Sequence, residues 1–267
     1  MAWTKSFLGW TLLQAPRLTV LRRVPLFGSL LHELSYRVVA PNQLLWFRVR
    51  AGLGKGLWLK LHPRTGKDYY EGEVEPVVQQ ALMQWLRQGM VFYDIGANIG
   101  FFTLIAASIV GNEGKVFSFE PEPELALRLI EHIDRNRFSN VSVVQAGLWS
   151  ATGRAMFVPS DPLMSPDRGT GNLAPATSGG NAVSVPCIAL DDFVRDSPPP
   201  DLIKCDVEGA EVEVFQGAAR LLAEHRPVVV CEVHSDVNGR RLGDLFKGCG
   251  YELNLLDENH LLALPCK

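Results

Sequence analysis

Four side chains near the ends of two predicted strands could carry acid–base chemistry. Strand 202–206 ends at Asp206 with Glu208 just beyond it, and strand 228–233 carries Glu232 and is followed by His234. Ligands of an open parallel sheet bind beyond the carboxyl ends of its strands, so these groups should share one rim. Histidine titrates near neutrality. We therefore expect His234 to take the proton of an attacking hydroxyl, with Glu208 or Glu232 acting directly or holding its tautomer.

The same rim offers a second chemistry. Asp206, Glu232 and His234 supply two oxygen ligands and one nitrogen ligand, a set that could hold Mg²⁺ or Mn²⁺ against a substrate hydroxyl. The metal-free site is preferred, and the metal site is its alternative. Glu208 and Glu211 also have a structural interpretation, because acidic residues stabilise the first turn of a helix that begins near Gly209.

The segment that must position this rim runs from Met90 to Glu120. A β-prone run at 91–95 stops at a glycine-bearing turn, apolar residues at 101–110 recur at helical spacing, and a second strand at 115–119 leads into an acid. This order is that of a nucleotide-binding half-fold. Glu120 lies twenty positions after Gly100, where a carboxylate can accept hydrogen bonds from both hydroxyls of an adenosine ribose.

The turn itself indicates which nucleoside binds. A dinucleotide fingerprint starting at Gly96 would require glycine at positions 98 and 101, which carry Asn98 and Phe101, so NAD is disfavoured. Asp94 and Asn98 instead suit a ligand with an ammonium and a carboxylate group, and S-adenosylmethionine has both. After a third strand at 141–144, Gln145 and Ala146 should lie beside the adenine.

The remaining patterns predict an α/β fold with helices on both faces of the sheet. We expect a hairpin from the alternating residues of 45–61, helices at 76–86, 122–138, 212–222 and 242–246, and a strand at 182–190. The runs 251–256 and 261–264 flank a tight turn and predict a final hairpin. An otherwise parallel sheet that ends in an antiparallel strand is typical of S-adenosylmethionine-dependent methyltransferases, so the sheet and the turn agree.

Composition limits the partners. The chain has 267 residues, 47% of them apolar, and its net charge of −3 lacks the basic field of a nucleic-acid binder. A small-molecule or glycan acceptor is expected, and no nucleic acid. Five scattered cysteines without a C-x-x-C motif predict reduced thiols and a cytoplasmic location. The oligomeric state is left open.

We divide the chain into three parts. Residues 1–43 are predicted to form a helical cap, with no signal peptide and no membrane span, although weak interfacial contact is an alternative. Residues 44–89 form the hairpin and the helix that leads into the core, and residues 90–267 form the cofactor-binding domain. Within it, residues 159–181 are rich in Gly, Pro, Ser and Thr and predict either a mobile loop or a surface insertion.

From about Leu44 to Leu264 the sequence resembles the FkbM-type family of S-adenosylmethionine-dependent methyltransferases. The matching motifs are YEGEVE at 70–75, YDIGANIGFF at 93–102, FEP at 119–121, LDD at 190–192, IKCDVEGAE at 203–211 and EVH at 232–234. The departures are Cys205, where a branched aliphatic residue is expected, and residues 1–43, which carry no family motif.

The resemblance implies an O-methyltransferase of sugars, polyketides or other secondary metabolites. It also implies that Asp206 and Glu208 line the reacting methyl group. The expected cofactor contacts are Asp94, Gly96, Ala97, Asn98, Gly100, Glu120, Pro121, Gln145, Ala146 and Asp206. Two functions from other classes stay open, a nicotinamide oxidoreductase and a non-catalytic nucleoside-binding module.

Overall fold

The computed structural model describes residues 43–63, 65–159, 171–174 and 182–266. The predicted N-terminal cap and most of the predicted loop at 159–181 lie outside these ranges. Among the described residues, no helix is both long and apolar enough to cross a bilayer. The division of the chain into parts and its cytoplasmic location stay predictions.

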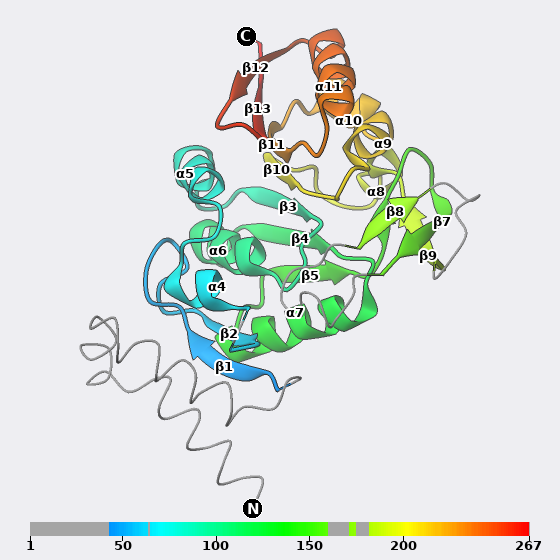
Figure 1. The fold of residues 1–267 in the computed structure, drawn as a ribbon. Helices are drawn as coiled ribbons and strands as arrows, with labels where there is room; N and C mark the ends of the chain where they lie inside the picture. Colours follow the sequence, from blue (N-terminus) through cyan, green and yellow to red (C-terminus); the bar gives the residue numbers. More distant parts are fainter. Residues whose placement is uncertain (1–42, 64, 160–170, 175–181, 267) are drawn as a thin grey trace, which may run out of the picture.

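Within the described chain, the central sheet has seven strands in the order β12-β13-β11-β10-β3-β4-β5. Only β13 runs against the others, because it pairs antiparallel with both β11 and β12. Figure 1 shows the C-terminal hairpin β12–β13 at one end of the sheet. The mostly parallel sheet with an antiparallel last strand is therefore confirmed. The strands are β3 (Val91–Ile95), β4 (Lys115–Phe119), β5 (Val141–Val144), β10 (Leu202–Cys205), β11 (Val228–Glu232), β12 (Tyr251–Leu255) and β13 (His260–Pro265).

Helices cover both faces of this sheet, and each face has its own apolar core. Successive strand residues point to opposite faces, so Phe92 packs into one core and Tyr93 into the other. The first core takes its helical side chains from α4 (Lys67–Glu71), α5 (Pro76–Trp85), α6 (Phe101–Val110) and α7 (Pro123–Asn136). The second takes them from α8 (Leu190–Phe193), α9 (Glu211–Gln216), α10 (Ala219–Glu224) and α11 (Asp236–Gly248).

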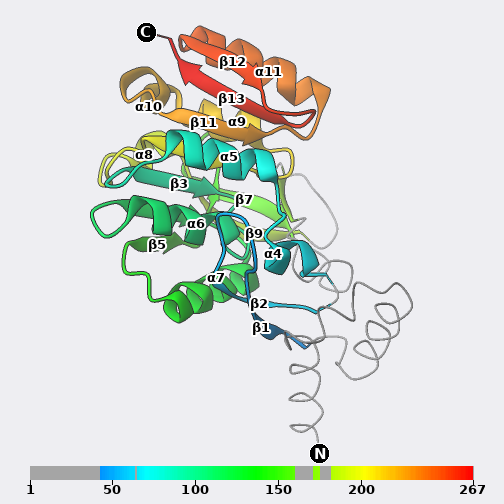
Figure 2. The same cartoon turned by 90° about the vertical axis from the view of Figure 1, so that its left-hand side faces the viewer.

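The predicted N-terminal hairpin is confirmed as β1 (Leu45–Arg48) paired with β2 (Trp58–Leu61), followed by a short helix α4 (Lys67–Glu71) that was not predicted. The β1–β2 hairpin and the C-terminal hairpin lie at opposite ends of the described fold (Figure 2). His132 of α7 joins the β1–β2 hairpin to the core, accepting from the Lys60 amide at 2.7 Å while its Nδ1 lies 2.7 Å from the Ile99 carbonyl oxygen. Burial lowers the pKa of His132 to about 4, so this bridging imidazole is neutral.

A second sheet of four strands, in the order β6-β9-β7-β8, lies beside the carboxyl end of β5 within the described chain. Its strands are β6 (Gly147–Leu148), β7 (Gly153–Val158), β8 (Asn172–Ala174) and β9 (Val183–Ile188). Residues 172–174 of the predicted loop at 159–181 form a strand that pairs antiparallel with β7, which the composition did not predict. The mobile loop or surface insertion stays a prediction for the rest of that range. Three residues are too few for any periodicity, so only the pairing reveals the strand.

The helix predicted at 212–222 is also corrected, because it is divided into α9 and α10 at Gly217. A Cβ at Gly217 would overlap the carbonyl oxygen of Trp149, so the chain makes a close backbone contact there. The Gly217 carbonyl accepts from the Asp191 amide at 2.8 Å instead of continuing the helix. The last helix, α11, is longer than the short segment predicted, and the Ser235 hydroxyl caps it by accepting from the Asn238 amide.

Candidate active site

The turn between β3 and α6 brings the backbone of two strands into contact. Gly96 has φ +72°, and a Cβ there would overlap the carbonyl oxygen of Asp206, so only glycine fits. The amides of Gly96 and Ala97 donate to the Phe119 carbonyl at 3.1 and 3.0 Å. Asn98 also has positive φ, +52°, and its side chain accepts from the Ile99 amide at 2.7 Å. The turn is thus held by the Phe119 carbonyl on one side and lies directly against the Asp206 backbone on the other.

Glu120 is positioned by the same turn. One carboxylate oxygen accepts from the Asn98 amide and the other from the Glu122 amide, each at 2.8 Å. The residue is only 5% exposed. Burial raises the pKa of Glu120 to about 7, against the two amides, which stabilise the charged form. Each oxygen keeps a further lone pair, so Glu120 can accept from hydroxyl groups of a ligand.

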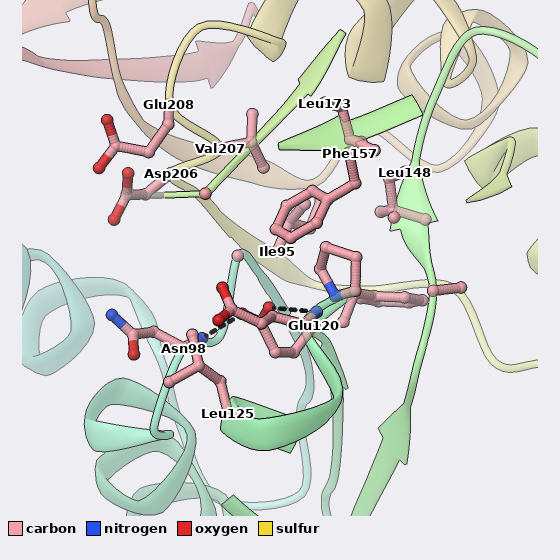
Figure 3. Close-up of a pocket in the computed structure, with 17 residues that line it drawn as sticks. Ile95, Asn98, Glu120, Leu125, Leu148, Phe157, Leu173, Asp206, Val207 and Glu208 are labelled. Atoms are coloured by element: carbon pink, nitrogen blue, oxygen red, sulfur yellow. Dashed lines mark hydrogen bonds between the residues drawn. The ribbon is translucent and has the colours of Figure 1, made fainter. Parts of the chain in front are cut away.

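A pocket opens above this carboxylate (Figure 3). Its polar side chains come from Asn98, Glu120, Glu122, Asp206 and Glu208, all at the carboxyl ends of central strands or in the segments that follow. An apolar slot bordered by a buried acid matches a nucleoside, with a flat base in the slot and ribose hydroxyls at the acid. The apolar side chains that line it are Ile95, Phe119, Leu125, Leu148, Phe157, Val207 and Leu173, the last of which comes from β8.

The structure brings together some of the predicted cofactor residues and not others. Asp94 is fully buried and does not line the pocket, and its carboxylate accepts from the Thr103 hydroxyl at 2.6 Å. The contact between Asp94 and a ligand ammonium stays a prediction. Gln145 is exposed and outside the pocket lining, and Ala97 and Gly100 shape the turn without lining the pocket. Those that line it are Gly96, Asn98, Glu120, Pro121, Ala146 and Asp206.

Sequence reasoning missed Lys204, which lies beside Asp94 in the register of β10 and β3. Its side chain is 5% exposed, and its Nζ lies 3.2 Å from both the Gly96 carbonyl oxygen and Asp206 Oδ2, and 3.8 Å from Asp94 Oδ1. Burial opposes the charged amine, but Asp206 and Asp94 outweigh it and raise the pKa of Lys204. The sequence did contain a signal for this ion pair, because a lysine inside an otherwise apolar strand is buried and a buried charge must be paired.

The rim predicted from the sequence forms around His234. Its Nδ1 lies 2.6 Å from Glu211 Oε1, while its Nε2 lies 3.4 Å from Glu208 and 3.7 Å from Asp206. The bond to Glu211 raises the pKa of His234 to about 9, so the imidazole is protonated at neutral pH and must lose that proton before it can act as a base. The sequence analysis interpreted Glu211 only as an acidic residue in the first turn of a helix, and Glu211 is the first residue of α9.

Glu232 lies at the end of β11, between two histidines. The ligating atoms of Asp206, Glu232 and His234 all lie within 4.8 Å of one another, as the metal alternative requires. The same holds for Glu232 with Glu75 and His260, two residues that sequence reasoning did not select. The sequence did not indicate that Glu75 and His260 belong to a site, because the two residues are far apart along the chain and only the fold brings them together.

An open sheet with one antiparallel strand next to its last strand, and a pocket over a glycine turn at the carboxyl ends, defines the class I methyltransferase fold. The methyltransferase FkbM domain model matches residues 94–253, and this chain belongs to that family.

Two curated relatives and one solved structure illustrate the similarity. The hexuronic acid methyltransferase AglP of Haloferax volcanii is 32% identical over 166 residues, covering 61% of this chain and 64% of AglP. Methyltransferase sdnD of Sordaria araneosa is 30% identical over 152 residues, covering 46% of this chain and 58% of sdnD. The chain thus spans less than two thirds of either relative. A solved FkbM methyltransferase from Methylobacillus flagellatus is 18% identical with a TM-score of 0.48, covering 75% of this chain and 56% of that one.

Proposed function

We propose that this protein is an S-adenosylmethionine-dependent O-methyltransferase that methylates a hydroxyl group on a small molecule or glycan. The observation that carries the proposal is the pocket, in which a buried Glu120 borders an apolar slot and leads to the rim of Asp206, Glu208 and His234. When bound, the cofactor supplies a methyl group made electrophilic by its sulfonium. Glu120 would hold the ribose hydroxyls and the apolar slot the adenine.

The acceptor oxygen would approach beside Asp206 and Glu208, since these two residues line the pocket and also lie next to His234. A carboxylate only accepts, so Glu211 favours the tautomer in which Nδ1 carries a proton. The nitrogen left to accept the proton of the acceptor hydroxyl is then Nε2, on the side of Asp206 and Glu208. This is the orientation that a general base needs.

The first acceptor class to test is a glycan that contains a uronic acid. AglP is named as a hexuronic acid methyltransferase, and it is 32% identical to this chain over 166 residues. A uronic acid offers two kinds of oxygen nucleophile. Its hydroxyls need a base and yield a methyl ether, whereas its carboxylate is already ionised at neutral pH and yields a methyl ester.

Calorimetry followed by product analysis tests the proposal. S-adenosylhomocysteine should bind to the purified chain and NAD should not, and tight NAD binding without a response to S-adenosylhomocysteine would refute a methyl-donor site. Labelled S-adenosylmethionine should then transfer its methyl group to uronic acid glycans or their neutral counterparts. A label that survives mild alkali is the expected ether, and an alkali-labile label would assign transfer to the carboxylate. Cofactor binding without transfer to any hydroxylated acceptor would favour the non-catalytic module.

The same reaction with a divalent metal at Asp206, Glu232 and His234 is the second candidate, favoured by the proximity of their ligand atoms. A metal there would activate the acceptor hydroxyl as a Lewis acid, which would make a histidine base unnecessary. Loss of transfer in EDTA with recovery in Mg²⁺ would support this candidate. Full activity after chelation would leave the metal-free reaction.

A further inference from the structure

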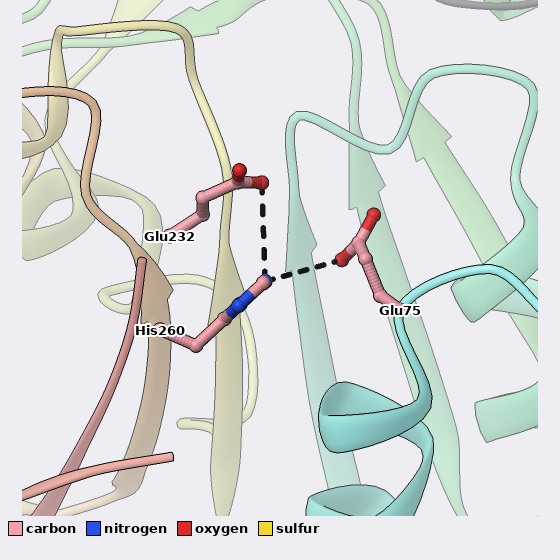
Figure 4. A group of neighbouring side chains, drawn as sticks. All are labelled: Glu75, Glu232 and His260. Atoms are coloured by element: carbon pink, nitrogen blue, oxygen red, sulfur yellow. Dashed lines mark ion pairs between the residues drawn. The ribbon is translucent and has the colours of Figure 1, made fainter. Parts of the chain in front are cut away.

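Glu75, Glu232 and His260 converge from three separate elements outside the cofactor pocket, and Glu232 also belongs to the rim (Figure 4). His260 Nε2 lies 3.6 Å from Glu75 Oε2 and 4.0 Å from Glu232 Oε2. The ligating atoms of the three residues all lie within 4.8 Å of one another. We call this group the three-residue cluster.

The backbone fixes the three positions before any ligand is present. Glu232 and His260 are direct partners in the antiparallel register of β11 and β13, so their side chains leave the same face of the sheet. Glu75 is the residue before α5 and has φ +39°, a conformation that is unfavourable for a residue with a side chain. Two residues of the cluster thus lie on paired strands and the third lies at the start of a helix, and such elements suit a preorganised ligand site.

Two atoms of the cluster are buried without a hydrogen bond. Among the described residues, His260 Nε2 and Glu75 Oε2 have no hydrogen-bond partner, although the His260 side chain is only 8% exposed. The other ring nitrogen, Nδ1, lies 2.8 Å from Asp257 Oδ1, which favours the tautomer whose Nε2 lone pair faces the two glutamates. Carboxylate partners of this kind orient histidine ligands in many metal sites.

The distances between the ligand atoms distinguish a direct hydrogen bond from a shared metal ion. A charge-assisted hydrogen bond between nitrogen and oxygen measures about 2.7–2.9 Å, shorter than either contact here. Two ligand atoms 3.6 Å apart are instead well placed for a common ion about 2.1 Å from each of them. The two carboxylates and one imidazole suit a divalent first-row ion that accepts both oxygen and nitrogen ligands.

We propose that Glu75, Glu232 and His260 bind one divalent transition-metal ion, with Asp257 orienting His260. The ion joins the start of α5 to the ends of β11 and β13. Glu232 also belongs to the set with Asp206 and His234. The three-residue cluster and the set of Asp206, Glu232 and His234 therefore share the Glu232 carboxylate. Variants of the residues that differ between the two sets show which set binds the ion.

The experiment uses Mn²⁺ and the full chain, followed by electron paramagnetic resonance. The unmodified protein should bind one Mn²⁺ with the echo modulation of a directly bound imidazole nitrogen. Glu75→Gln and His260→Gln should weaken binding at least tenfold, and His260→Gln should abolish the modulation. Asp206→Asn and His234→Gln should keep both signals. Glu73→Gln, an exposed neighbour of Glu75, is the matched control and should bind like the unmodified protein.

Three results would overturn the proposal: no Mn²⁺ bound to the unmodified protein, unchanged binding in Glu75→Gln, or loss of the nitrogen modulation in His234→Gln but not in His260→Gln. Circular dichroism establishes that each variant is folded. Should His260→Gln fail to fold, Glu75→Gln against Glu73→Gln decides the question, because neither change shortens a side chain. Mn²⁺ binding is measured without cofactor or acceptor, so the result is independent of methyl transfer.

Discussion

Glu211 holds His234 by a contact of 2.6 Å between Oε1 and Nδ1. The Glu211 side chain is fully buried at the start of α9, where it also accepts from the Gly209 amide at 2.8 Å and the Asn238 side chain at 2.7 Å. These partners lower the pKa of Glu211 against the effect of burial, and Glu211 in turn raises the pKa of His234. The charge of the rim histidine is thus set by a residue outside the cofactor pocket.

The rate of methyl transfer should depend on this pair. Only the neutral imidazole can accept a proton, so kcat/KM should increase with pH up to about 9, the pKa of His234. Glu211→Gln removes the charge that raises this pKa and should move the profile toward lower pH. His234→Ala should remove the pH dependence and most of the turnover while leaving S-adenosylhomocysteine affinity unchanged. A rate that falls as pH approaches 9 would mean that the imidazolium is the active form.

Stability should also respond to pH through His234. The pKa of His234 is about 9 in the folded protein and about 6.5 in the unfolded chain. Protonated His234 therefore stabilises the fold fully below about pH 6.5, and this stabilisation is lost as the pH rises to about 9. The midpoint of thermal unfolding should therefore fall across this window. In the metal-free chain, His260 also has a pKa raised to about 9 and contributes in the same range, so with a chelator present Glu211→Gln should reduce the fall without abolishing it. Glu224→Gln, at an exposed position, should leave the slope unchanged.

Glu120→Gln should weaken S-adenosylhomocysteine binding. The amide side chain has one acceptor oxygen where Glu120 has two, so it cannot accept from both backbone amides and also from two ribose hydroxyls. A hydrogen bond to a charged group contributes about 1.5–3 kcal/mol, so the loss of one such bond to the ligand should weaken binding roughly ten- to hundredfold in calorimetry. The exposed Glu124→Gln is the control. Equal affinities in the two variants would remove Glu120 from the binding site.

Gly96→Ala should destabilise the fold far more than Gly89→Ala. Both glycines have positive φ, +72° and +82°, so both changes strain the backbone. Only at Gly96 does the new Cβ meet the Asp206 carbonyl oxygen, whereas nothing lies within 4 Å at Gly89. In denaturant unfolding the difference should exceed about 1 kcal/mol, the order of the added overpacking. Similar losses would show that the turn tolerates a side chain.

Lys204→Met should unfold the protein at lower denaturant concentrations than Lys60→Met. The buried Lys204 neutralises Asp94 and Asp206, and its removal leaves those carboxylates uncompensated. Breaking a buried pair in this way costs about 3–5 kcal/mol. Lys60 pairs with Glu131 at the surface, where its side chain is 31% exposed, and loss of such a pair costs about 1 kcal/mol or less. Comparable unfolding midpoints would contradict the pairing of Lys204.

Local patterns predicted much of this fold. Strand β3, the glycine turn, α6 and the acid Glu120 follow from alternation, helical spacing and glycine positions within one short segment. The strand β8 and the break at Gly217 were not predictable in this way. The first depends on pairing with β7, and the second on a close backbone contact with Trp149.

The sequence by itself determined the family, the sheet with its antiparallel last strand, and the acids that reach the rim, because each depends on residue order within a local segment. Only the tertiary structure decided which groups share a site. It buried Asp94 against Thr103, and it placed Glu211 on His234. It also brought Glu75 to His260 from distant parts of the chain, because the edge of a sheet collects residues by strand order and not by sequence order.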